Sequence, residues 1–255
     1  MRVVLKVGTS TLAHKTGLIN MRRVQNLVKV MSDIKNSGVE IIYVTSGAVG
    51  VGRGKLMLRE APKDLATKQA AAAVGQGELM HMYDRIFSKF SHTTAQLLIT
   101  VSDVDEDSHK HNFVSTLGRL LELGVIPIVN ENNAIGTPDT LIGNNDQIAA
   151  IVAGSMKADL LIMLTDVDGL YDSNPKTNPD AKKIDVVEEL GEEHFKSAEG
   201  TTGFGTGGMD TKLKAVATAT KRGCDVIIAN GNNPEILYDI IDGKNVGTRF
   251  LGKKK

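Results

Sequence analysis

The sequence predicts an α/β protein in which a mostly parallel β-sheet is covered by helices on both faces. Short apolar runs rich in β-branched residues alternate with helical patterns along most of the 255 residues, and such alternation is typical of strand–helix–strand units. The predicted strands are apolar throughout, which indicates burial on both faces. We find no internal repeat, low-complexity tract or linker. The chain is therefore expected to form one α/β domain, with an N-terminal and a C-terminal lobe that meet near residues 164–171.

Each element follows from a local pattern. A helix is expected over residues 21–37 because apolar residues recur on one helical face, and Gly38 would end it. Further helices are expected at about 64–89, 112–123, 146–156, 210–222 and 234–241, with Gly124, Gly223 and Gly243 as further helix ends. Strands are expected at 2–7, 39–45, 94–101, 125–130, 159–165, 224–229 and 246–251.

Charge and cysteine content exclude several classes of function. The chain has 30 Lys and Arg against 30 Asp and Glu, a formal net charge of zero, whereas a nucleic-acid or anionic membrane partner requires a basic surplus. The single cysteine, Cys224, rules out an intrachain disulfide and fits a reducing compartment, so a cytoplasmic protein is expected. No window approaches the roughly 18 uninterrupted apolar residues of a membrane span. The 26 glycines suggest loops that approach a ligand closely.

Glycine and polar residues follow four of the predicted strands where each strand ends. These segments are Lys6-Val-Gly8-Thr9-Ser10, Thr45-Ser46-Gly47-Ala48, Asn130-Glu131-Asn132-Asn133 and Thr165-Asp166-Val-Asp168-Gly169, with Gly143-Asn144-Asn145-Asp146 at a helix start soon after the third. Any one of them alone reads as a turn or a helix cap. Because open α/β sheets bind ligands at the carboxyl ends of their strands, the segments together predict a ligand site.

Two glycine loops fit phosphate binding, because backbone N–H groups and a helix N-terminus both favour an anion. One is Gly8-Thr9-Ser10, and the other is Gly203-Phe-Gly205-Thr206-Gly207-Gly208. The second matches the GxGxxG pattern, but the residues before it are not strand-like, which argues against dinucleotide binding. The Walker pattern, GxxxxGK followed by Ser or Thr, is absent from the sequence, so a P-loop enzyme is excluded as well.

Two lysines are candidate phosphate ligands: Lys6 at the end of the first strand and Lys212 at the start of a late helix. Phosphoryl transfer needs in-line positioning and positive charge on the phosphate oxygens. Two lysines reaching the phosphates from opposite lobes would supply that charge, and Asp146 would hold them in register. Taken alone, Lys6 is equally well explained as a strand-end lysine whose charged head reaches solvent, and Lys212 is better explained as an exposed helix lysine. It is their combination with the glycine loops that predicts phosphoryl transfer.

Six motifs spread along the chain resemble those of the glutamate 5-kinases, which belong to the amino-acid kinase family. They are Lys6-x-Gly8-Thr9-Ser10, Thr45-Ser46-Gly47-Ala48, Lys68-Gln69-Ala-Ala-Ala-Ala-Val74-Gly75-Gln76-Gly77, Pro127-Ile-Val-Asn130-Glu131-Asn132, Leu164-Thr165-Asp166-x-Asp168-Gly169-Leu170-Tyr171 and Gly205-Thr206-Gly207-Gly208-Met209-x-Thr211-Lys212. The resemblance runs from Arg2 to about Phe250. The runs 68–77 and 205–212 together distinguish this kinase from its relatives.

The resemblance implies a three-layer α/β/α sandwich with a mainly parallel sheet of about eight strands. It implies a single kinase domain over residues 1–255, with an acceptor-binding lobe at about 1–160, a nucleotide-binding lobe at about 161–255 and no additional RNA-binding-like domain. The implied reaction uses ATP with Mg²⁺ to phosphorylate the γ-carboxylate of L-glutamate, giving L-glutamyl 5-phosphate in the first step of proline biosynthesis. L-Proline as a feedback inhibitor and a homodimer or homotetramer are implied too.

The resemblance also assigns roles by position. Lys6 and Lys212 are expected to stabilise the transferred phosphate, and Asp146 to orient them. The residues expected to bind glutamate are Ser46, Gly47, Asn130, Asn133 and Asn145. The residues expected to bind the nucleotide and its phosphates are Lys6, Gly8, Thr9, Ser10, Thr165, Asp166, Gly205, Thr206, Gly207, Gly208, Met209 and Lys212. Mg²⁺ is expected to be held mainly by ATP phosphates and water, so no dedicated metal ligand is assigned.

Two positions depart from the family pattern. The chain has Asn133 and Asn144 where the family usually has aspartate. Both substitutions keep shape and hydrogen-bonding reach but remove negative charge. If the first position pairs with the substrate ammonium, its loss weakens that contact by about 1–3 kcal/mol. The resulting hypothesis is an enzyme that still uses glutamate but with a raised KM.

Two alternative functions remain open at this point. One is another kinase of the same family, for acetylglutamate, aspartate, carbamate or UMP, against which the 68–77 run argues. The other is a catalytically silent amino-acid sensor, against which the retained Lys6, Asp146 and Lys212 argue. His109 and His111 lack a third ligand at metal-binding spacing and are expected in a surface loop. Cys224 is expected in the core, since no nearby base marks it as a nucleophile.

Overall fold

The computed structural model describes residues 1–12, 14, 18–138, 141–142, 144–175, 177–198 and 208–253, and for Thr9, Ser10, Ser102 and Asp105 it describes the backbone alone. The predicted nucleotide-binding residues Gly205, Thr206 and Gly207 lie outside this range.

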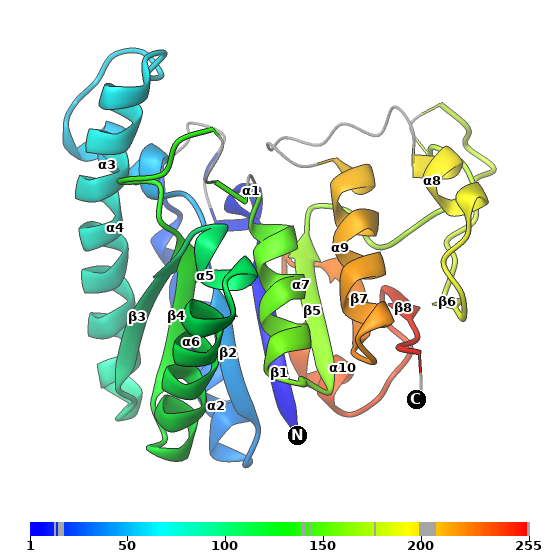
Figure 1. The fold of residues 1–255 in the computed structure, drawn as a ribbon. Helices are drawn as coiled ribbons and strands as arrows, with labels where there is room; N and C mark the ends of the chain where they lie inside the picture. The colour runs from blue at the N-terminus through cyan, green and yellow to red at the C-terminus, as the bar shows by residue number, and fades with distance from the viewer. Residues whose placement is uncertain are drawn as a thin grey trace.

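In the described residues a single sheet of eight strands has the order β3-β4-β2-β1-β5-β7-β8-β6 (Figure 1). The strands are β1 (Arg2–Val7), β2 (Glu40–Val44), β3 (Thr94–Ile99), β4 (Ile126–Glu131), β5 (Leu160–Thr165), β6 (Val186–Val187), β7 (Asp225–Asn230) and β8 (Thr248–Phe250). Every neighbouring pair is parallel except β7 with β8, which is antiparallel. The predicted mainly parallel sheet is confirmed.

Helices cover both faces of the sheet, which makes three layers (Figure 1). One face carries α6 (Asp107–Glu122), α7 (Asn145–Ser155), α8 (Glu192–Ala198) and α9 (Met209–Lys221), and the opposite face carries α2 (Met21–Asn36), α3 (Ala48–Lys55), α4 (Leu65–Phe87) and α10 (Ile236–Ile241). The short helices α1 (Thr9–Leu12) and α5 (Ser102–Asp105) follow β1 and β3, and a 3₁₀ turn at Ser88–Phe90 follows α4. None of the helices in the described part of the chain has the length and hydropathy needed to span a membrane.

The alternation of side chains along each strand separates two cores. In β1, Val4 packs with the apolar residues of α7 and α9, whereas Val3 and Leu5 pack with those of α2 and α4. All three are at most 3% exposed. Strands buried on both faces explain why the strand sequences are apolar throughout.

The structure contains the short elements α1, α5, α8 and β6, which the sequence analysis did not assign, and it differs from the prediction at two further helices. Helix α6 begins at Asp107, so His109 and His111 lie on a helix and not in a loop, although both are exposed as expected. The apolar pattern appears only after these histidines, which is why the predicted helix starts too late. The small-residue stretch after β2 also forms a helix, α3, that the sequence analysis did not assign.

Helix α3 packs against α4 with their backbones in contact. A Cβ on Gly52 would lie 1.7 Å from the carbonyl oxygen of Ala71, and a Cβ on Gly75 would lie 1.8 Å from that of Ala48. These two glycines are therefore required by helix packing and not by a ligand. The close contact fixes the start of α3, next to Ser46 and Gly47.

Candidate active site

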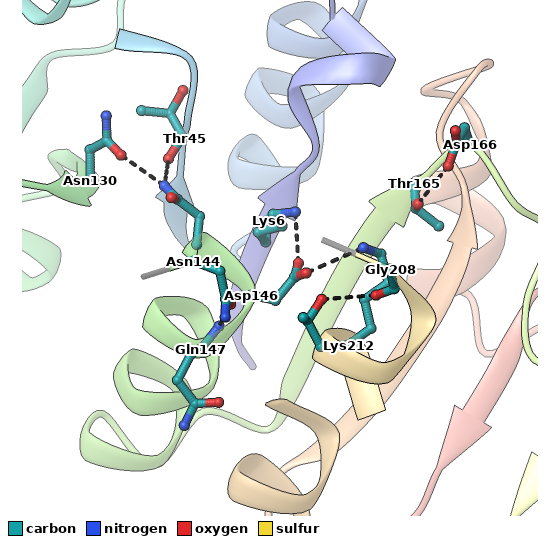
Figure 2. A network of polar contacts seen from close by, with 12 residues as sticks. Lys6, Thr45, Asn130, Asn144, Asp146, Gln147, Thr165, Asp166, Gly208 and Lys212 are labelled. Carbon is teal, nitrogen blue, oxygen red and sulfur yellow. Dashed lines mark hydrogen bonds and ion pairs between the residues drawn. The ribbon is translucent and has the colours of Figure 1, made fainter. Parts of the chain in front are cut away.

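Lys6, Asp146 and Lys212 meet at the carboxyl end of the sheet (Figure 2). Lys6 lies near the end of β1, Asp146 in the first turn of α7 and Lys212 in the first turn of α9. The Lys6 Nζ lies 2.7 Å from Asp146 Oδ1, and the Lys212 Nζ lies 3.2 Å from Asp146 Oδ2. The three residues are 7%, 2% and 6% exposed. Lys6 shares its strand face with Val4, so it points toward the helices that carry its two partners.

The ion pairs shift the pKa values of Lys6 and Asp146 in directions that favour their charged forms. Burial lowers the pKa of Lys6, and the neighbouring Asp146 carboxylate opposes that change. Burial would by itself raise the pKa of Asp146, but the two ammonium groups outweigh burial and hold its pKa below the usual value. With all three groups ionised, the cluster carries one net positive charge. A buried positive charge of this kind suits a polyphosphate.

The N-termini of α7 and α9 both lie beside this cluster, because Asp146 and Lys212 are in their first turns. Asn144 caps α7, since its Oδ1 accepts a hydrogen bond from the Gln147 backbone N–H at 2.7 Å. Gly208 caps α9 without a side-chain hydrogen bond, and the Thr211 hydroxyl donates to the Gly208 carbonyl at 2.8 Å. The uncapped N–H groups at the start of α9 are the expected ligands of a phosphate. The Asn144 side chain is thus explained as a helix cap, a role that its aspartate counterpart would also fill.

Among the predicted acceptor-binding residues, Asn130 and Asn145 interact directly. Figure 2 shows Asn130, together with Thr45, on the side of Asp146 away from Lys212. The Asn145 Nδ2 donates to the Thr45 carbonyl and, at 2.7 Å, to Asn130 Oδ1. Gly47 has φ 94°, in the left-handed region, and precedes the first residue of α3 beside Ser46. The Asn133 amide donates to the Glu131 carbonyl at 3.3 Å, which turns it toward the end of β4.

The described nucleotide-binding candidates lie at three places. Thr165 and Asp166 are at the end of β5, Gly208, Met209 and Lys212 at the start of α9, and Lys6, Gly8, Thr9 and Ser10 at the end of β1 and in α1. The Thr165 hydroxyl donates to Asp166 Oδ1 at 3.1 Å, and Asp166 is close enough to raise the pKa of Lys6 slightly against the effect of burial. The Gly8 backbone N–H donates to the Leu164 carbonyl at 3.1 Å, which joins the loop after β1 to β5. Met209 is buried in the core beneath α9.

The sequence analysis did not identify two residues that contact the predicted acceptor-binding segments. Gln76 and Tyr83 of α4 reach the sheet, where Tyr83 lies 3.1 Å from the Thr45 hydroxyl and 2.9 Å from the Tyr43 hydroxyl. Gln76 bonds to Asn130 at 2.9 Å. A single polar residue in a helix carries no periodic signal, and only its place in the 68–77 motif pointed to Gln76.

No three His, Cys, Asp or Glu side chains within the described ranges converge as a metal cage. Asp166 and the phosphates of a nucleotide are nevertheless suitable oxygen ligands for Mg²⁺, which usually binds through one or two carboxylates, phosphates and water.

Two buried lysines bridged by one carboxylate, at the ligand-binding edge of a parallel sheet and beside two helix N-termini, define a phosphotransferase site. Residues 1–230 match the model of the amino acid kinase family. The chain belongs to the amino acid kinase family.

Curated relatives match over nearly the whole chain. A glutamate 5-kinase of Clostridium perfringens is 48% identical over 99% of this chain and 96% of its own length. A glutamate 5-kinase of Clostridium acetobutylicum is 47% identical over 100% of this chain and 96% of its length. The glutamate 5-kinase of Caldanaerobacter subterraneus is 47% identical over 100% of this chain but 68% of its length.

Solved structures share the fold at low identity. The carbamate kinase of Giardia lamblia bound to AMP-PNP aligns with a TM-score of 0.72 at 16% identity, covering 99% of this chain and 98% of its own. The isopentenyl phosphate kinase of T. acidophilum aligns with a TM-score of 0.68 at 21% identity, covering 98% and 100%. These similarities establish the fold. At such low identity they do not indicate which acceptor this chain phosphorylates.

Proposed function

We propose that this chain transfers the γ-phosphoryl group of ATP to the side-chain carboxylate of L-glutamate, forming L-glutamyl 5-phosphate for proline biosynthesis. The observation that carries the proposal is the buried Lys6–Asp146–Lys212 cluster between the acceptor-side amides and the end of β5. The choice of glutamate rests on relatives named glutamate 5-kinase at 44–48% identity. They favour glutamate over the acceptors of other family members and over a silent sensor.

Phosphoryl transfer requires that the acceptor carboxylate and the γ-phosphate are held in line and that positive charge lies near the phosphate oxygens. An oxygen of the γ-carboxylate forms the new bond to the γ-phosphorus while the bond from that phosphorus to the β,γ-bridging oxygen breaks, and ADP leaves. The acceptor carboxylate is already ionised at neutral pH, so no general base is needed. Lys6 and Lys212 neutralise charge on the phosphoryl and leaving oxygens. Asp146 holds both ammonium groups in place without contacting the phosphate.

Mg²⁺ bound to the ATP phosphates would neutralise charge on the β- and γ-oxygens. Asp166, which follows β5 and accepts a hydrogen bond from the Thr165 hydroxyl, would be the carboxylate that contacts the Mg²⁺.

Further features belong to the same proposal. Residues of about 1–160 would bind the acceptor and those of about 161–255 the nucleotide, within one kinase domain. L-Proline is proposed as a feedback inhibitor and a dimer or tetramer as the assembly. The cytoplasmic location rests on the single cysteine and stays a prediction.

ATP-dependent hydroxamate formation tests the acceptor. With hydroxylamine present, L-glutamate is expected to give γ-glutamyl hydroxamate, L-aspartate little product, and added L-proline a lower rate. UMP phosphorylation without glutamate turnover would instead identify a different kinase of this family.

A further inference from the structure

A row of side-chain amides, buried at its centre, connects α4 to the candidate acceptor site. The Gln76 Nε2 of α4 donates to Gln96 Oε1 of β3 at 3.2 Å, and the Gln76 Oε1 accepts from Asn130 Nδ2 of β4 at 2.9 Å. Asn130 Oδ1 in turn accepts from Asn145 Nδ2 at 2.7 Å. Gln76 is 6% exposed and Asn130 is 1% exposed. We call Gln96, Gln76, Asn130 and Asn145 the amide relay.

Two backbone groups fix the orientation of the amides in the relay. Asn130 Oδ1 also accepts from the Glu131 backbone N–H at 2.9 Å, and Asn145 Nδ2 donates to the Thr45 backbone carbonyl. A backbone N–H cannot accept and a backbone carbonyl cannot donate, so neither asparagine can exchange its oxygen with its nitrogen without losing a bond. The orientation of Gln76 then follows, because its oxygen must face the Asn130 nitrogen.

This arrangement determines what Asn145 can offer to a ligand. Both hydrogens of its Nδ2 are engaged, by Thr45 and by Asn130. Its Oδ1 remains as an acceptor, to which no group in the described part of the chain donates. An amide oxygen in this position attracts an ammonium group and repels a carboxylate. The relay therefore favours binding of the amino group of an amino-acid acceptor at Asn145.

We propose that Gln76 is a positioning residue for the acceptor: by holding the Asn130 amide, it fixes the Asn145 oxygen that receives the substrate ammonium. The inference rests on the proposed function. Gln76 is assigned no contact with the acceptor, because the residue is 6% exposed and its amide bonds to Gln96 and Asn130 within the protein. Its removal leaves the buried Asn130 nitrogen without its partner and frees the asparagine to move.

The test uses the full chain with ATP and L-glutamate, and compares Gln76→Met with the unaltered protein. Methionine keeps the volume of glutamine but forms no comparable hydrogen bond. The KM for glutamate is expected to rise about tenfold, while the KM for ATP stays within about twofold and kcat within about threefold. An unchanged glutamate KM, or an equal rise in both KM values, would overturn the proposal.

Gln147→Met is the matched control. The Gln147 amide of α7 donates to the Thr218 hydroxyl at 3.0 Å, outside the relay, so its loss should leave the glutamate KM within about twofold. If Gln76→Met does not fold, Gln96→Met cuts the relay at its exposed end, and a rise of about threefold in glutamate KM is expected. No rise in that variant counts against the relay.

A double variant tests the route through Asn130. In an Asn130→Ala background, Gln76→Met should add little further increase in glutamate KM, since the residue it acts through is gone. Equal increases in both backgrounds would contradict the inference. If the unaltered chain does not phosphorylate glutamate at all, the proposed function fails instead, and the two failures are therefore distinguishable.

Discussion

The two sides of the active site lie on opposite faces of the same sheet and are built from different chemistry. Lys6 and its partners lie on the face covered by α7 and α9 and interact through full charges. Asn130 shares its strand face with Ile126 and Ile128, which pack toward α4, and it interacts through neutral amides. The consecutive residues Asn145 and Asp146 join the two sides. Under the proposed function, the charged groups would stabilise the transferred phosphoryl group and the neutral amides would orient the acceptor.

Loss of a lysine from the charged side should have the largest effect. Lys212→Met removes a buried ammonium that would bind the transferred phosphate, so kcat is expected to fall about 10³-fold. Steady-state kinetics with ATP and glutamate measure this fall in kcat. Lys214→Met, on the same helix but 65% exposed and paired with Asp210, should retain kcat within about twofold. Similar losses in the two variants would show that the helix, and not the buried charge, is what matters.

Asp146→Asn should lower kcat about 10²-fold and change its pH dependence. Burial lowers the pKa of Lys6 and Asp146 raises it, so removing that carboxylate lowers the Lys6 pKa further. Activity needs the protonated lysine, and its loss at alkaline pH should therefore begin at least about one pH unit lower. The kcat–pH profile of Asp210→Asn is the control. An alkaline limb that does not move would contradict this electrostatic role.

The acceptor side depends on close helix packing, and Gly52 tests it. Gly52→Ala would place a Cβ 1.7 Å from the Ala71 carbonyl oxygen, and the unfolding free energy is expected to fall by about 1–3 kcal/mol. Gly50→Ala, on the same helix with nothing within 4 Å of its Cβ, should be neutral or stabilising by up to about 1 kcal/mol. Urea denaturation compares them, and equal stabilities would refute the packing account.

The smallest expected effect is on glutamate affinity. Asn133→Asp restores a negative charge near the proposed ammonium site, and the KM for glutamate should fall about tenfold, with the KM for ATP unchanged. The structure turns the Asn133 amide toward the Glu131 carbonyl, a contact that an aspartate cannot make, which would favour rotation toward the acceptor. A glutamate KM equal to that of the unaltered chain would rule out a role for this position in ammonium binding.

Much of the fold and the charged cluster could be predicted from the sequence. Apolar strands revealed the parallel sheet, and Lys6 and Lys212 stood beside glycine loops at strand and helix ends. The amide relay was not predictable in the same way. Gln76 and Gln96 come together only because α4 packs over β3, and nothing local to either residue indicates that contact. Helix α3 escaped prediction because glycines that lower helix propensity are required there by contact with α4.

The most direct test of the account follows the oxygen atoms of the acceptor. L-Glutamate labelled with ¹⁸O in both γ-carboxylate oxygens is incubated with ATP and the full chain. L-Glutamyl 5-phosphate closes to a five-membered lactam when its amino group displaces phosphate, and the bridging oxygen leaves with that phosphate. Attack by the carboxylate on the γ-phosphorus predicts one ¹⁸O atom in each phosphate released, measured by mass spectrometry. Unlabelled phosphate would mean that water and not glutamate receives the phosphoryl group, and would contradict the account.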